Sequence, residues 1–178
     1  SSSWLLWLYQ PYMKWTGVPV WFFGVAFAIF NLIAAFMSNF AHKIENRLGQ
    51  EKTLVLFMIL QVSPLLLMSI IITPFSFLFI LGHQTVRGLS RPIFNDWILR
   101  YTYADKRATI LSLNSLGNRL FFAVTSPIIG YIANNTDYPT NFRIQAGVIT
   151  IIFLIMLVSY RKIPQKYFQI KDNVAPNQ

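Results

Sequence analysis

The chain has 178 residues, of which 54% are hydrophobic and only 12% are charged, and its formal net charge is +9. A soluble domain carries about 25% charged residues, so this composition argues against a soluble fold. The basic residues do not gather on one soluble face, which removes the case for nucleic-acid binding. The chain has no cysteine, which excludes thiol chemistry and cysteine–zinc sites.

Two long uncharged runs, 18–41 and 53–86, decide the class of protein. A helix needs about 20 apolar residues to cross roughly 30 Å of hydrocarbon. Lipid offers no partner for unpaired backbone groups, so such spans must be helical. The sequence therefore predicts an all-α fold, a polytopic transmembrane helix bundle in contact with a lipid bilayer.

The predicted elements follow one another through short connectors. Residues 1–13 are expected to be the end of a helix whose beginning is missing, because the apolar stretch from Trp4 to Met13 is too short to span. Complete helices are predicted over 18–41, 53–73, 75–101, 108–133 and 144–160. Residues 1–164 are expected to form the transmembrane half-bundle and residues 165–178 a cytoplasmic tail.

The basic residues predict the orientation in the membrane. Ten of the 15 Lys and Arg residues lie in the connectors 42–52 and 100–107 or in the tail segment 161–171. The intervening connectors carry only Lys14 and Arg143. Cytoplasmic loops are enriched in Lys and Arg, so we expect the basic side, and with it the C-terminus, to be cytoplasmic. The expected location is the plasma (inner) membrane.

Polar residues share one face of the predicted helix 75–101. Gln84, Arg87, Arg91 and Asn95 are spaced by three and four positions. An arginine at the bilayer centre costs at least about 2.5–3.5 kcal/mol, so Arg87 should face protein or a water-filled cavity. It is either a functional residue or an anchor paired with another helix. Arg91 lies one turn nearer the cytoplasm, where an anchoring role is favoured.

The helix 108–133 carries two polar stripes, so it is not expected to face lipid all round. Asn114 and Asn118 lie on one stripe and Arg119 on the other. Arg119 has the same two interpretations as Arg87, and interhelical hydrogen bonding is the alternative for the asparagines. In the first span, Asn31 stands alone and favours a structural hydrogen bond. Gln10, beside Pro11, is compatible with a broken helix that lines a cavity.

Small and charged residues on the same helices predict helix contacts. Small residues let membrane helices approach closely, and four glycines are therefore expected to pack against neighbouring helices: Gly82, Gly88, Gly117 and Gly130. Asp96 and Arg100 are four positions apart and predict an ion pair near the cytoplasmic end of their helix.

The sequence offers little that could support catalysis. It contains no paired-carboxylate site, no histidine-rich metal cluster, no glycine-rich phosphate loop and no nucleophile–base spacing. We therefore expect no enzyme activity, no cofactor and no metal site.

One connector carries a resemblance to a known family. HKIENRLGQEK, residues 42–52, is similar to the second copy of the signature loop of major facilitator superfamily transporters, roughly G-x-x-x-D-R-x-G-R-R/K. Arg47, Leu48 and Gly49 match R-x-G, whereas Asn46 stands in place of the acid. Further on, RPIFNDWI and KRATILSLNSLGNRLFFAVTSPIIGYIA resemble the tenth and eleventh helices of bacterial efflux-type or uncharacterised members.

The resemblance implies the C-terminal six-helix half of the major facilitator fold, from the end of the seventh helix to the twelfth. The partners it implies are a small-molecule substrate, with or without a coupling proton, and a missing N-terminal half of the same transporter. The cytoplasmic gate loop would contain Glu45, which could replace the missing acid, with Arg47 and Gly49. The residues that the resemblance implies for the substrate cavity are Gln10, Asn31, Gln84, Arg87, Asn114 and Asn118. The second polar stripe of the helix 108–133 adds Arg119 to these candidates.

Two functions remain open at this point. The first is secondary active transport of a small solute by alternating access. Its mid-membrane arginines would suit an anionic or zwitterionic solute, or they would pair with carboxylates of the missing half. The second is a truncated orphan half that acts as a non-transporting membrane scaffold or as a homodimer.

Overall fold

The computed structural model describes residues 5–100, 102 and 106–162, and this part of the chain contains helices and no strand. The predicted tail 165–178 and the first four residues lie outside it. Short 3-10 helices, η1 (Val20–Phe22) and η2 (Pro74–Phe79), precede two of the α-helices. The α-helices are α1 (Leu5–Trp15), α2 (Phe23–Ile70), α3 (Ile80–Arg100), α4 (Arg107–Asn135) and α5 (Tyr138–Lys162).

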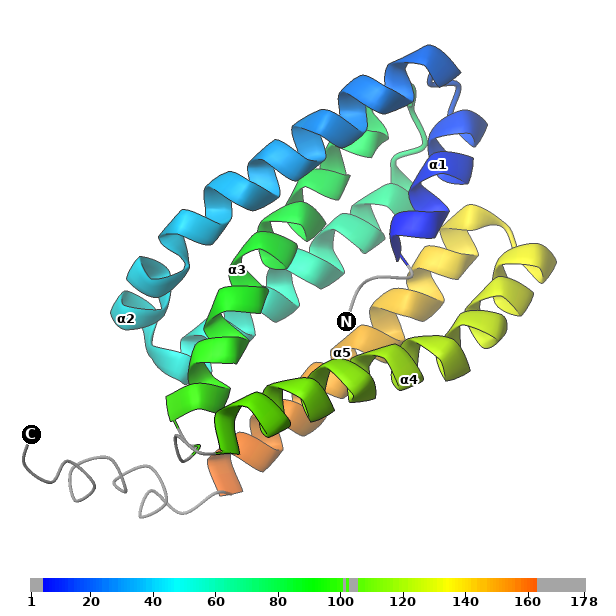
Figure 1. Cartoon of the computed structure of the whole chain (residues 1–178). Coiled ribbons are helices and arrows are strands. Elements are labelled where there is room, and N and C mark those ends of the chain that lie inside the picture. The colour runs from blue at the N-terminus through cyan, green and yellow to red at the C-terminus, as the bar shows by residue number, and fades with distance from the viewer. Residues whose placement is uncertain (1–4, 101, 103–105, 163–178) are drawn as a thin grey trace, which may run out of the picture.

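The connector expected over 42–52 is helical, which corrects that expectation. Residues 23–48 and 50–70 form two helical arms of α2, and the chain turns between them at Gly49, whose φ is 77° and ψ is 169°. A positive φ suits glycine because it has no Cβ to clash with the backbone. The turn therefore needs a single residue, and the helices reach it from both sides (Figure 1).

Other helix ends also differ from the expected ones. The helix expected from residue 75 starts as η2 and becomes α-helical only at Ile80. The helix expected from residue 144 begins at Tyr138. The Asp137 carboxylate accepts a hydrogen bond from the Thr140 backbone N–H at 3.2 Å. A side chain that satisfies a first-turn N–H in this way favours helix initiation, so the polar loop is shorter than its composition indicated.

The core lies between α1, both arms of α2, α3 and α5. Aromatic rings fill one end of it, where the Tyr12 ring packs edge-on against Phe142 with ring centres 4.9 Å apart. The Tyr12 hydroxyl is hydrogen-bonded to Ser76 at 2.7 Å and donates to the Met68 carbonyl oxygen. The largest fully buried side chains include Tyr9, Tyr12, Phe30, Phe57, Phe142, Leu65, Met68, Leu89 and Ile93.

Close helix contacts involve two of the four glycines expected to make them. A Cβ at Gly82 would lie 2.6 Å from Cγ of Pro64, and one at Gly88 would lie 2.2 Å from the Ala34 carbonyl oxygen. These two glycines let α3 approach α2. At Gly117 and Gly130 an added Cβ would meet nothing within 4 Å, so the expectation was wrong for α4.

The helix α4 is packed differently from the rest, because none of its residues is buried. It runs beside α5 at one side of the bundle (Figure 1). By length and composition, two described helices could cross a membrane: 20–70, which contains both arms of α2, and Tyr138–Lys162. The expectation of five complete spans is not met by this measure. Polar residues on α3 and α4 lower the mean hydropathy of these two helices. The same polar residues make the two helices candidates for lining a cavity.

Candidate functional site

The first element of the site is a contact between α2 and α3. The Arg87 guanidinium donates a hydrogen bond to the Asn31 side-chain oxygen, 56 residues away in sequence. The Asn31 amide nitrogen in turn donates to the Phe27 carbonyl oxygen at 2.8 Å, which fixes the orientation of the amide. Arg87 is half-buried. Its described partner is thus a neutral amide, which leaves the positive charge uncompensated.

Two buried polar side chains precede Arg87 on α3. Gln84 and His83 are each only 1% exposed. The Gln84 carbonyl oxygen and both ring nitrogens of His83 have no hydrogen-bond partner among the described residues. The Tyr9 ring of α1 lies 6.2 Å from the His83 ring, centre to centre. His83 was not among the predicted site residues, because burial of a single histidine gives no signal in the sequence.

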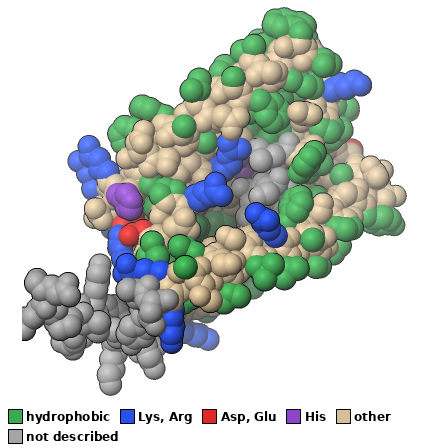
Figure 2. Space-filling view, viewed as in Figure 1, with side chains coloured by type: hydrophobic (Ala, Val, Ile, Leu, Met, Phe, Trp, Pro, Cys, Tyr) green, Lys and Arg blue, Asp and Glu red, His purple; other side chains and the backbone are tan. Residues whose placement is uncertain are grey.

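Asn31 and the remaining polar candidates are exposed. On α4, the Asn118 amide donates to the Asn114 backbone oxygen at 2.9 Å, so these two residues are joined within one helix. Arg91 and Arg119 are exposed on α3 and α4, and Gln10 is exposed on α1. In Figure 2, Lys and Arg side chains gather on the face between α3 and α4. No hydrogen bond between described residues connects the α4 asparagines to α3.

The carboxylates of the described part of the chain are all engaged elsewhere. Glu45 is bound to Arg100 and Glu51 to Arg161. Asp96 forms an ion pair with Arg100, as the i,i+4 spacing predicted, and Asp137 accepts from the Thr140 backbone. The arginines of α3 and α4 in the middle of these helices therefore have no described carboxylate to neutralise them. Guanidinium groups bind carboxylates and phosphates in two-pronged geometry, so this face can attract an anion.

A second cluster lies where α2 turns. The two Glu45 oxygens accept hydrogen bonds from the two terminal nitrogens of Arg100, both at 2.9 Å, and Glu45 also accepts from the Trp97 indole N–H at 3.0 Å. The Glu45 side chain is only 4% exposed. Burial alone raises the pKa of Glu45, but the hydrogen bonds from Arg100 and Trp97 outweigh it and hold the pKa below its ordinary value.

The three residues expected in a gate loop therefore have different surroundings. Glu45 joins α2 to α3, Arg47 is exposed, and Gly49 supplies the backbone turn. Trp97 was not predicted as a partner of Glu45, and Arg100 was expected to pair with Asp96 alone. Both partners lie more than 50 positions from Glu45 in sequence, beyond any local spacing rule.

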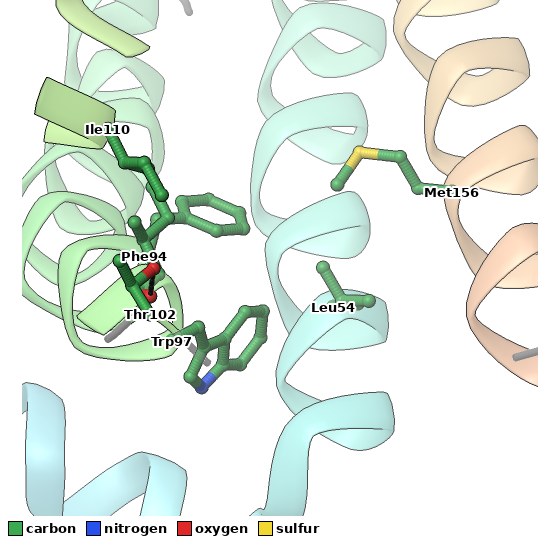
Figure 3. A pocket seen from close by; sticks show the side chains of 7 residues that line it. Leu54, Phe94, Trp97, Thr102, Ile110 and Met156 are labelled. Atoms are coloured by element: carbon green, nitrogen blue, oxygen red, sulfur yellow. Dashed lines mark hydrogen bonds between the residues drawn. The ribbon is translucent and has the colours of Figure 1, made fainter. Parts of the chain in front are cut away.

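An apolar groove of about 470 Å³ lies close to this cluster (Figure 3). The second arm of α2 and the helices α3, α4 and α5 border it, and Trp97 belongs both to the groove and to the Glu45 cluster. The Thr102 hydroxyl donates to the Ile98 carbonyl oxygen at 2.6 Å, so it offers the groove no free donor. The lining residues are Leu54, Phe94, Trp97, Ile98, Thr102, Ile110 and Met156.

Comparison with known proteins identifies the family. No curated protein and no solved structure gives a match to the chain. The family model of the Major Facilitator Superfamily matches residues 1–174, which is nearly the whole sequence and includes the α2 turn, the polar face of α3 and α4, and the Glu45 cluster. The chain therefore belongs to the Major Facilitator Superfamily, whose members are integral membrane transporters of small solutes.

Proposed function

We propose that the chain forms the C-terminal half of a secondary active transporter that moves a small anionic solute by alternating access. The observation that carries this proposal is the pair formed by Arg87 and Asn31. A half-buried guanidinium in an apolar bundle has a neutral partner, while each described carboxylate is engaged elsewhere. A charge within a membrane protein is costly unless it faces water, a counter-ion or a ligand.

The distribution of polar residues supports a cavity on this face. Arg91 lies on α3 and Arg119 lies on α4. These two helices make little contact with each other, and α4 has no buried residue. A helix with an uncovered polar stripe needs another surface or water against it. The N-terminal half of the same transporter would supply this surface, and the solute would bind between the halves. The face of α3 and α4 would then line the path of the solute.

The basic residues support an orientation in which the α2 turn and the C-terminus are cytoplasmic. The connector between α3 and α4 and the end of α5 are basic, whereas the opposite ends of the helices carry Lys14 and Arg143. The cluster of Glu45, Trp97 and Arg100 would then hold the cytoplasmic ends of α2 and α3 together. We assign to it the role of keeping these ends rigid while the two halves rock.

Transport by the full-length protein in vesicles tests the proposal. Uptake of inorganic phosphate, sulfate and succinate is compared with uptake of glucose and choline, in the wild type and in Arg87→Gln and Arg87→Lys. We expect uptake of at least one anion. We also expect Arg87→Gln to reduce it by tenfold or more and Arg87→Lys to reduce it less, because Lys keeps the charge and loses the fork geometry.

Arg143→Gln is the matched control, because it removes one exposed positive charge from α5, which does not belong to the polar face of α3 and α4. It should leave anion uptake within about twofold of the wild type, since a single exposed charge acts through a screened potential. Uptake of choline but of none of the anions would contradict the proposed substrate class. Anion uptake that survives Arg87→Gln would remove Arg87 from the cavity.

A further inference from the structure

Trp97 forms one wall of the apolar groove beside the Glu45 cluster, and its contacts hold it in place. The Trp97 ring stands edge-on to the Phe94 ring, with ring centres 5.3 Å apart and planes at 89°. The Trp97 N–H is already bonded to Glu45, so the indole presents only carbon to the groove. Leu54 and Met156 close the other side (Figure 3). A volume of about 470 Å³ lies within the range of ligand pockets, roughly 300–1,000 Å³, and its lining selects an apolar occupant.

Positive charge stands one helical turn from this groove. Ile110 lines it, and Arg107 precedes Ile110 by three positions on α4, the spacing of side chains on one helix face. Lys106 is the N-cap residue directly before Arg107. Both cations are exposed at the start of α4, and the helix begins there with no side-chain cap on its N–H groups. The helix dipole adds partial positive charge at this end. Two exposed cations and a helix N-terminus therefore lie near the opening of the groove.

Two described carboxylates near the groove share one cation, so together with Lys106 and Arg107 the described charges there sum to one net positive charge. Glu45 and Asp96 are bound to Arg100, Glu51 is bound to Arg161, and Asp137 accepts from Thr140 at the far end of α4. An occupant that satisfies both features must have an apolar tail and an anionic head. Basic pockets between membrane helices bind the headgroups of anionic lipids in this way.

We propose that this groove binds one anionic phospholipid, with an acyl chain against Phe94, Trp97 and Met156 and with the phosphate headgroup at Lys106 and Arg107. The orientation given under Proposed function would place this lipid in the cytoplasmic leaflet. The bound lipid would fill the space between α3, α4 and α5, where direct helix contact is slight. Lipid binding is a property distinct from transport, so it holds or fails independently of the solute.

Direct binding to the full-length protein in detergent tests the proposal. Native mass spectrometry measures the retention of added phosphatidylglycerol against phosphatidylcholine of the same acyl chains, and thermal unfolding is followed in parallel. We expect preferential retention of phosphatidylglycerol and a higher melting temperature with it. The double variant K106Q/R107Q should lower the affinity for phosphatidylglycerol by about tenfold or more and leave phosphatidylcholine unaffected.

A second variant tests the binding of the acyl chain separately from the binding of the headgroup. Met156→Trp fills part of the groove and should reduce the retention of both lipids. Lys14→Gln combined with Arg143→Gln is the control, because it removes the same charge from the opposite ends of the helices and should leave the preference intact. Equal retention of the two lipids by the wild type, or a preference that survives K106Q/R107Q, would overturn the proposal. Neither result depends on whether the protein transports an anion.

Discussion

Gly88 on α3 lies against the backbone of Ala34 on α2, so closely that a Cβ at Gly88 would be 2.2 Å from the Ala34 carbonyl oxygen. The next nearest atoms, at 2.9 and 3.0 Å, also belong to the Ala34 backbone, which cannot swing aside as a side chain can. Small residues permit such close approach between membrane helices. Because Gly88 follows Arg87 directly, the same approach brings Arg87 within reach of Asn31.

Gly88→Ala should therefore destabilise the bundle. The added methyl group has to push α3 away from α2, and overpacking of this kind costs about 1–3 kcal/mol. Thermal unfolding of the purified protein in detergent measures the loss. Gly117→Ala is the control, since an added Cβ there meets nothing within 4 Å and alanine has the higher helix propensity, by up to about 1 kcal/mol. Equal melting temperatures for Gly88→Ala and the wild type would contradict the close contact.

Asn31→Asp tests whether the charge of Arg87 is used by the solute. The new carboxylate would pair with the Arg87 guanidinium, which now bonds to the neutral amide. We expect a melting temperature equal to or above that of the wild type, together with anion uptake at least tenfold lower, because the introduced carboxylate competes with the anion for the guanidinium. Uptake into vesicles and thermal unfolding together provide the measurement.

The control for this substitution is Asn39→Asp, at an exposed position two turns along the same helix. It changes the charge of α2 equally and should leave uptake unaltered. Should Asn31→Asp transport the anion as the wild type does, Arg87 would serve as an anchor between α2 and α3, which is the alternative that the sequence left open.

Glu45→Gln should weaken the junction of α2 and α3. The substitution removes the charge that two nitrogens of Arg100 share, although the Trp97 bond can persist. Loss of a charged hydrogen-bond partner at a largely buried site costs about 1–3 kcal/mol. Glu51→Gln is the matched control, because the ion pair between Glu51 and Arg161 is exposed. The accessible fraction is 42% for the Glu51 side chain and 71% for the Arg161 side chain. Exposed pairs contribute only about 0–1 kcal/mol.

The stabilisation by Glu45 should also depend on pH. Burial raises the pKa of this carboxyl, and the hydrogen bonds from Arg100 and Trp97 outweigh burial, so its folded-state pKa lies below the ordinary value. Such a group stabilises the fold fully above the unfolded-state pKa and loses this effect as the pH falls through the folded-state pKa. The difference in melting temperature between wild type and Glu45→Gln should thus be constant around neutral pH and shrink in acid.

Much of the fold was predictable because it depends on local patterns. Uncharged runs located the arms of α2, and i,i+4 spacing located the pair of Asp96 and Arg100. The start of α5 was missed because composition alone marks polar residues as loop, whereas Asp137 binds the first-turn N–H of Thr140. Periodicity also cannot tell how tightly a helix packs, which is why Gly117 was expected to form contacts that α4 does not make.

The candidate site was predictable only in part, for a similar reason. Spacing grouped Gln84 with Arg87 on one face of α3, but it could not identify Asn31 as the partner of Arg87 on another helix. It suggested a structural hydrogen bond for Asn31, and the structure supplies two. The bonds from Trp97 and Arg100 to Glu45 join segments more than 50 residues apart, so only the packed bundle reveals them.

Gly49→Ala tests the turn that places Glu45 beside α3. The φ of 77° and ψ of 169° at Gly49 lie in a region that is almost exclusive to glycine, and the substitution should cost on the order of 1–3 kcal/mol. Gly147→Ala on α5 is a fitting comparison, because that glycine is helical and an added Cβ meets nothing within 4 Å. It should be neutral or slightly stabilising. If the melting temperature of Gly49→Ala were no lower than that of Gly147→Ala, the two arms of α2 would not be joined by a single-residue turn that requires glycine. The position of Glu45 would then have to depend on its contacts with Trp97 and Arg100 alone.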